Sequence, residues 1–266
     1  MAEHTQPITT YREFLAALLS DRERFFEEVV ESVGLHAKLR HAVVTIVGLS
    51  AFFGLVAGAY SGPAQAVSSA IKLPFLFFAT FLICFPAFFV VQVLVGSRLR
   101  LLQVIVLVFG SLALTSVLLA AFVPITLFFL ATGANYYFQH LLNIAIAAVA
   151  GLFGVYALHE GLSLVCEKRG VYPRKALTIM RAWAVLFAFV GIQLAWNLRP
   201  FLGDRSEPFR IIGNYQGNFY AAVLYATKQL LAGDQRPAAP GRPAEPRRVP
   251  VLPFDTTADS ARPNRP

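Results

Sequence analysis

The chain has 266 residues, of which 56% are hydrophobic and only 14% are charged, with a formal net charge of +8. A soluble domain carries about 25% charged residues, so this composition excludes an ordinary soluble globular protein. No basic patch with interleaved aromatic residues is present, which argues against nucleic-acid binding. The two cysteines, Cys84 and Cys166, do not make a disulfide framework.

The N-terminal segment, residues 1–36, is acidic, with seven acidic and three basic residues. Apolar residues between positions 9 and 34 follow a 3.6-residue period, which predicts an amphipathic helix, broken at Ser20 or Asp21 into two short helices. We expect it to pack on the cytoplasmic ends of membrane spans. A membrane-surface anchor is the alternative, although its acidic face would be repelled by anionic lipid. No cleavable signal peptide is visible, so the first span is expected to act as the insertion signal.

Residues 37–200 contain apolar runs long enough to cross a bilayer core of about 30 Å. The predicted fold is therefore an all-α integral membrane bundle of about five transmembrane helices. Pro124 interrupts the third run, which predicts a kinked or tilted helix or a short re-entrant end. The spans are expected at about residues 42–60, 70–94, 101–132, 138–164 and 176–196.

Basic residues fall on alternate loops. Residues 95–100 and 165–175 are basic, whereas residues 61–69 and 133–137 contain no basic residue. By the positive-inside rule this pattern predicts a cytoplasmic N-terminus in the cell (inner) membrane. Lys38 and Arg40 are expected to precede the first span on the same side.

Two prolines lie in the second apolar run. Pro74 is expected in the first turn of its span, where proline costs little. Pro86 is the interior proline and should kink the helix, because it leaves the Leu82 carbonyl without its usual donor. The Thr80 hydroxyl and small residues on neighbouring helices are the candidates to satisfy that site.

The C-terminal part divides into two segments. Residues 201–233 are predicted to form an amphipathic juxtamembrane segment, for which a re-entrant or sixth crossing is the competing topology. Residues 234–266 are rich in Pro, Arg and Ala without a hydrophobic period, which predicts a disordered tail.

Polar residues inside spans are the candidate functional residues, because they are unfavourable there. Glu160 and Arg181 lie at similar distances from the loop that joins their spans, so we predict an ion pair between facing helices. A structural clasp is favoured over a proton relay for this pair. The alternative is that each side chain snorkels separately to the headgroups. His159 is adjacent. Asn143 and Asn197 lie at similar depth at the outer end, where interhelical hydrogen bonding is the default interpretation and a polar substrate path the minority one.

Small residues recur at four-residue intervals, including Gly54 with Gly58 and Ala150 with Gly154. They predict close helix packing, either within one bundle or between protomers.

The run "IKLPFLFFATFLICFPAFFVVQVLVGSRLRLLQVI", with a glycine-basic turn between two spans and Pro124 late in the next, resembles bacterial multi-pass membrane proteins of the Yip1-like type. The later stretches "LAWNLRPFLG" and "GNFYAAVL" are similar to a signature of bacterial membrane proteins. The aspartate-leucine-tyrosine-glycine-proline motif of eukaryotic Yip1 proteins is absent. The resemblance implies a non-enzymatic role in membrane organisation or assembly, and it transfers no catalytic residue.

Three functions are compatible with this pattern. The favoured one is a non-enzymatic membrane scaffold or accessory subunit, with the lipid bilayer around it and protein partners bound through the N-terminal helix. The second is a small-molecule or ion transporter using His159, Glu160 and Arg181. The third is an intramembrane enzyme, for which the span cores lack convergent acidic or histidine residues. No cofactor or metal site is predicted, and the oligomeric state stays open.

Overall fold

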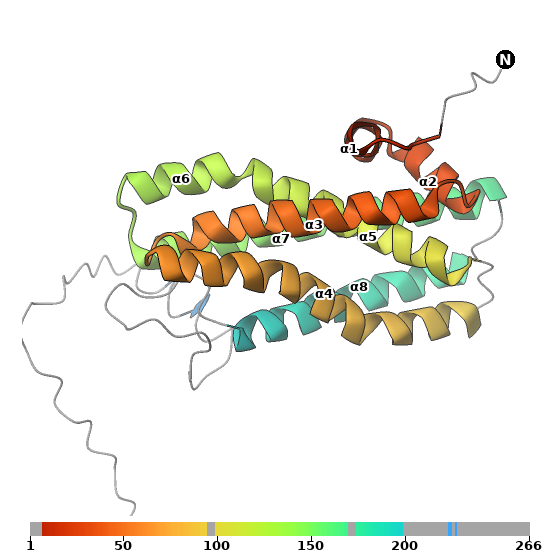
Figure 1. Ribbon diagram of the computed structural model, residues 1–266. Coiled ribbons are helices and arrows are strands. Elements are labelled where there is room, and N and C mark those ends of the chain that lie inside the picture. Colours follow the sequence, from red (N-terminus) through yellow and green to blue (C-terminus); the bar gives the residue numbers. More distant parts are fainter. Residues whose placement is uncertain (1–6, 95–98, 170–173, 199–222, 225–226, 228–266) are drawn as a thin grey trace, which may run out of the picture. The chain divides into compact units, whose positions relative to one another are not determined.

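The computed structural model describes residues 7–94, 99–169, 174–198, 223–224 and 227 (Figure 1). The chain divides into two units, residues 1–232 and 233–266, and every helix described below belongs to the first unit. The predictions for residues 201–222 and 228–266, including the tail, lie outside the described residues.

The described residues are helical and contain no strand. The helices, in chain order, are α1 (Tyr11–Ser20), α2 (Arg22–Val30), α3 (Leu35–Gly58), α4 (Pro63–Leu94), α5 (Leu101–Ala121), α6 (Val123–Ala131), α7 (Tyr136–Arg169) and α8 (Arg174–Asn197). Four segments are long and apolar enough to cross a membrane: α3, α4, the α5–α6 pair, and α7 as far as Gly161. The protein is therefore a helical membrane bundle.

The helix α5 forms the centre of the bundle. In the most apolar part of the α5–α6 segment 72% of residues are buried, against 28% in the corresponding parts of α4 and α7. Side chains such as Leu82 on α4 and Leu152 on α7 are largely exposed, as expected of surfaces that face lipid. In Figure 1, α3, α4, α7 and α8 run alongside one another around this centre.

The first two spans pack through glycines. A Cβ atom added at Gly54 would lie 2.5 Å from the Ser69 carbonyl oxygen, and one at Gly58 would lie 2.6 Å from the Gln65 carbonyl oxygen. The absence of side chains at these two positions lets the α3 and α4 backbones approach closely. The structure thus assigns the Gly54–Gly58 motif to packing within one chain.

Two span boundaries differ from the sequence predictions. Helix α3 begins at Leu35, so Lys38 and Arg40 lie inside its first two turns and do not precede it. Helix α4 begins at Pro63, which places Pro74 in its interior, so the prediction that Pro74 starts the helix was wrong. The reason is that residues 63–70, although small and polar, continue the helix by packing against Gly54 and Gly58.

The third span is divided, as Pro124 predicts. Helix α5 ends at Ala121, Phe122 caps it, and α6 begins at Val123 with Pro124 in its first turn. Proline has no backbone N–H and cannot continue the hydrogen-bond ladder of α5. The Phe122 carbonyl instead accepts bonds from the N–H groups of Ile125 and Thr126, both at 3.1 Å.

At the other end of the bundle, residues 9–34 form α1 and α2, which are separated at Asp21 and lie across the start of α3 (Figure 1). The Asp21 backbone is non-helical (φ −135°, ψ 62°), and its carboxylate accepts a bond from the Arg24 N–H at 3.3 Å. Aspartate is a favoured N-cap residue because its side chain satisfies a donor that the helix leaves free. We call the bundle end that carries α1 and α2 the capped end.

The start of α1 gives a pH-dependent prediction. One carboxylate oxygen of Glu13, Oε2, accepts bonds from the backbone N–H groups of Thr9 and Thr10 at 3.0 and 3.1 Å. These bonds, with the Thr9 bond the larger cause, hold the pKa of Glu13 below its ordinary value of 4.5. Because the folded-state pKa is lowered, the stabilisation is complete above the ordinary value and is lost as the pH falls through the lowered one.

We therefore expect the amide signals of Thr9 and Thr10 to shift together in NMR spectra as the pH falls below the ordinary Glu13 pKa of 4.5. In the Glu13→Gln variant, which cannot titrate, these shifts should disappear. Signals that stay constant over this range in the unsubstituted protein would contradict the assignment.

Candidate functional site

The hydrophobic side of the capped end is built from two phenylalanines that lie over glycines. The ring of Phe25 covers Gly110 of α5, with ring atoms 2.8 Å from where a Cβ would stand, and the ring of Phe26 covers Gly161 of α7. Both phenylalanines are fully buried, and Phe14 of α1 meets Phe25 edge to face at 5.8 Å. Helix α2 thus fits between α5 and α7, where only glycine leaves room for the rings.

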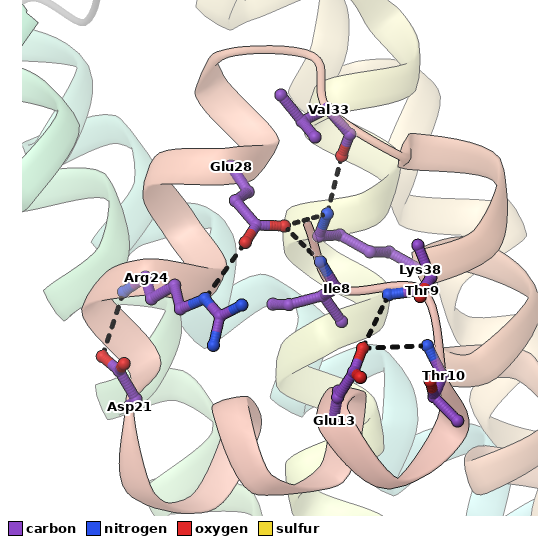
Figure 2. A network of polar contacts seen from close by, with 9 residues as sticks. All are labelled: Ile8, Thr9, Thr10, Glu13, Asp21, Arg24, Glu28, Val33 and Lys38. Carbon is purple, nitrogen blue, oxygen red and sulfur yellow. Dashed lines mark hydrogen bonds and ion pairs between the residues drawn. The ribbon is translucent and has the colours of Figure 1, made fainter. Parts of the chain in front are cut away.

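A buried ion pair joins α2 to α3 (Figure 2). The ammonium of Lys38 lies 2.7 Å from Glu28 Oε2, and the Lys38 side chain has no exposed surface while that of Glu28 is 12% exposed. The ammonium also donates to the Val33 carbonyl at 2.6 Å. The carboxylate of Glu28 accepts two further bonds, from the Ile8 N–H at 3.0 Å and from Arg24 Nε at 3.2 Å. Several partners compensate the loss of hydration that burial imposes on both charges.

Gln103, on the first turn of α5, holds the end of α2. Its Nε2 group lies 2.7 Å from the Val30 carbonyl oxygen and 3.1 Å from the Val29 carbonyl oxygen, and its Oε1 accepts a bond from the Arg100 N–H at 2.7 Å. The last carbonyls of a helix have no partner within the helix. Gln103 supplies that partner and at the same time caps its own helix.

The chain before α1 is attached to α3 as well. The His41 Nε2 group donates to the Thr9 carbonyl at 3.0 Å, and the Tyr11 hydroxyl lies 3.3 Å from the Thr45 hydroxyl. A carbonyl only accepts, so the His41 proton is on Nε2. Together with Glu28, Lys38 and Gln103, these contacts attach α1 and α2 to the bundle along their whole length.

The predicted Glu160–Arg181 ion pair is not formed, and that prediction was wrong. Glu160 Oε2 instead pairs with Arg22 Nη1 of α2 at 3.1 Å. Arg181 of α8 donates to His159 Nε2 through Nε at 3.1 Å and Nη2 at 2.9 Å. Glu160 and Arg181 do lie on neighbouring helices, α7 and α8. The arginine that reaches Glu160 belongs to α2, at the capped end.

This exchange of partners gives a second prediction. The reversed pair Arg22→Glu with Glu160→Arg is expected to keep the protein as stable as the unsubstituted chain, whereas each single change should cost less than about 1 kcal/mol. The effect is small because Arg22 and Glu160 side chains are 33% and 46% exposed. Thermal unfolding of the purified proteins measures the stability of the double variant and of each single variant. The structure would be contradicted if the double variant Glu160→Arg, Arg181→Glu restored thermal stability and the double variant Arg22→Glu, Glu160→Arg did not.

Pro86 lies inside α4 at the point where α8 is attached. The indole of Trp183 on α8 stacks on Phe88, with ring centroids 4.3 Å apart, and its N–H donates to the Cys84 carbonyl at 3.0 Å. The candidate role of Thr80 was wrong, because its hydroxyl donates to the Leu76 carbonyl at 2.7 Å and not to that of Leu82. The Trp183 N–H thus reaches α4 at Cys84, two residues before the proline, and not at the Leu82 carbonyl that Pro86 leaves without its usual donor.

The two asparagines differ in their surroundings. Asn197, at the end of α8, is exposed. Asn143 is directed into the bundle, and its amide nitrogen and oxygen are shielded from solvent without a hydrogen-bond partner among the described residues. The interhelical bond that we predicted for Asn143 is thus absent from the described part of the chain.

The structure therefore brings His159 and Arg181 together, and it joins Glu160 to α2. It leaves Pro86, Asn143 and Asn197 apart from that group. In the described residues, no three His, Cys, Asp or Glu side chains gather as a metal site requires. The strongest polar cluster is the one around Glu28 and Lys38, which the sequence analysis did not identify.

No family model, curated protein or solved structure matches the chain, so the resemblance to Yip1-like proteins stays a prediction.

Proposed function

We propose that the protein is a non-enzymatic, multi-pass scaffold or accessory subunit of a membrane complex, and that α1 and α2 form its docking surface for a protein partner. The observation that carries this proposal is the attachment of α1 and α2 to the bundle by the Glu28–Lys38 pair and the Phe25 and Phe26 rings. A helix pair held this way moves with the spans. It can transmit the position of a bound partner to the membrane helices.

The outer surface of this helix pair is available for contact. Arg12 and Ala16 on α1 are exposed, and Leu19 is 49% exposed. A hollow of about 370 Å³ lies at the start of α3 and α5, with His36, Arg100 and Leu102 in its lining. An apolar side chain flanked by charged groups is a common composition for a protein contact.

In this proposal the capped end is cytoplasmic and the membrane is the inner cell membrane. Arg40 and Arg100 lie at the capped end, and the positive-inside rule favours their location on the cytoplasmic side. Helix α8, Arg174–Asn197, is the proposed fifth span, since its 24 residues suffice to cross the hydrocarbon core.

A photo-crosslinking amino acid placed at Leu19 tests the docking surface in cells. The expected result is a protein adduct of defined mass at Leu19. A matched position at Leu152, which is 70% exposed on α7, should give lipid adducts only. If Leu19 yields no protein adduct, or if Leu152 yields the same one, the docking surface is not on α1.

The alternative function is a small-molecule or ion transporter that uses His159, Glu160 and Arg181. The break between α5 and α6 favours it, because discontinuous spans often form substrate sites in transporters. Substitution of Arg181 by methionine separates the two functions: a transport defect with an unchanged Leu19 adduct supports the transporter.

A further inference from the structure

Two amide side chains on α7 lie inside the bundle without partners. Gln139 is 1% exposed, and Asn143 follows it one helical turn later. The nitrogen and oxygen atoms of both amides are shielded from solvent and have no hydrogen-bond partner among the described residues. These four atoms are at the bundle end opposite to the capped end.

The neighbours of these residues on α7 show where the amides point. The ring of Phe138 meets Phe129 of α6 edge to face at 4.7 Å, and the ring of Tyr136 lies 6.0 Å from Tyr60, just after α3. At 100° per residue, Gln139 and Asn143 project between these two directions. The amides therefore point from α7 toward the region where α3 and α6 pack against it.

The same stripe of α7 continues into an apolar cluster. Ile146 and Ala150 are buried there against Val56 of α3 and Val123 of α6. A buried amide without a partner is strongly unfavourable, and within a bilayer no water replaces the missing bonds. Unpaired polar groups inside a membrane require an explanation, and a bound molecule is one that would satisfy both amides at once.

The chemistry of the amides defines what could bind. Each amide offers two N–H donors and one carbonyl acceptor and carries no charge. The buried Thr126 of α6 adds a hydroxyl whose proton is used on the Phe122 carbonyl at 3.3 Å, which leaves its oxygen lone pairs to accept. A complementary ligand is small and uncharged, and has both donors and acceptors.

Access to this region depends on α6. The break at Phe122 separates α6 from α5, and Phe128 on the outer side of α6 is 61% exposed. A short helix joined to the bundle centre through a break can shift without disturbing α5. We propose that Gln139 and Asn143 line an internal binding site for a small uncharged polar molecule, which enters when α6 moves.

The test uses the full chain in perdeuterated detergent, with acetamide as the probe. Saturation-transfer NMR should detect acetamide binding to the unsubstituted protein and to Asn197→Leu, which changes an exposed asparagine elsewhere. The signal should be lost in the double variant Gln139→Met, Asn143→Leu. With acetamide in excess, the unfolding midpoint of that variant should be no higher than that of the unsubstituted protein, because bound acetamide then satisfies the amides.

Three results would overturn the proposal. One is the absence of saturation transfer in the unsubstituted protein, and a second is equal transfer in the double variant. The third is stabilisation by sodium chloride and not by acetamide, which would assign the oxygens to a cation. If the double variant does not fold, as circular dichroism would show, Gln139→Met alone must lose the acetamide signal.

Discussion

Replacing Glu28 with glutamine is expected to lower the free energy of unfolding by about 3 kcal/mol and to release α1 and α2 from the bundle. The reason is that Lys38, which has no exposed surface, loses the carboxylate charge at 2.7 Å and keeps only neutral acceptors such as the Val33 carbonyl. The ammonium is then buried without a compensating negative charge, which is strongly unfavourable. Cleavage by trypsin after Arg22 and Arg24 measures the release, and denaturant unfolding measures the free energy.

The control is Glu23→Gln, which removes an exposed carboxylate from the same helix and should change stability by less than about 0.5 kcal/mol. The double variant Glu28→Gln, Lys38→Met should recover part of the loss, because it leaves no buried ammonium without a counter-charge. An unchanged trypsin pattern in Glu28→Gln would show that the buried pair does not hold the helices.

Replacing Gly54 with alanine is expected to lower the free energy of unfolding by about 1–3 kcal/mol. The new methyl group would lie 2.5 Å from the Ser69 carbonyl oxygen, which is backbone and cannot turn aside as a side chain would. Helices α3 and α4 must therefore separate along this contact. Loss of thermal stability of the purified protein is the measurement.

Gly48 on the same helix provides a matched control, because a Cβ added there meets nothing within 4 Å. Gly48→Ala should be neutral or stabilise the protein by up to about 1 kcal/mol, as alanine is the better helix former. If Gly48→Ala and Gly54→Ala destabilise the protein equally, flexibility of α3 matters more than its contact with α4.

The sequence predicted the four helices that are long and apolar enough to cross a membrane, because the apolar runs and Pro124 record requirements that each helix meets by itself. Its errors arose where tertiary contacts decide. Pro74 lies inside α4 because the helix is extended by packing on Gly54 and Gly58. Glu160 pairs with Arg22 of α2 and not with Arg181. The distance of a residue from a loop predicts its depth in the bundle, but it does not predict which side chain it contacts.

The Glu28–Lys38 cluster was missed although a signal existed. Glu28 follows Phe25 by three residues and precedes Val29, so it lies on the apolar face of its own helix. A carboxylate in that position requires a buried cation, and Lys38 is the first lysine that follows. The loop-charge pattern places Lys38 before the first span, where no buried partner is expected for it. The amide of Gln139 gave no comparable signal, because a polar residue near a span end is ordinary.

The phenylalanines of α2 lie over Gly110 and Gly161, which belong to helices that follow α2 in the chain. During synthesis the first 34 residues leave the ribosome long before α7 exists, so α2 has no complete surface to occupy at that stage. The helix pair can take its final position only after residue 161 has entered the membrane. Docking of the N-terminus therefore reports that the bundle has been completed, and a partner that recognises the docked pair would select finished molecules over partly inserted ones.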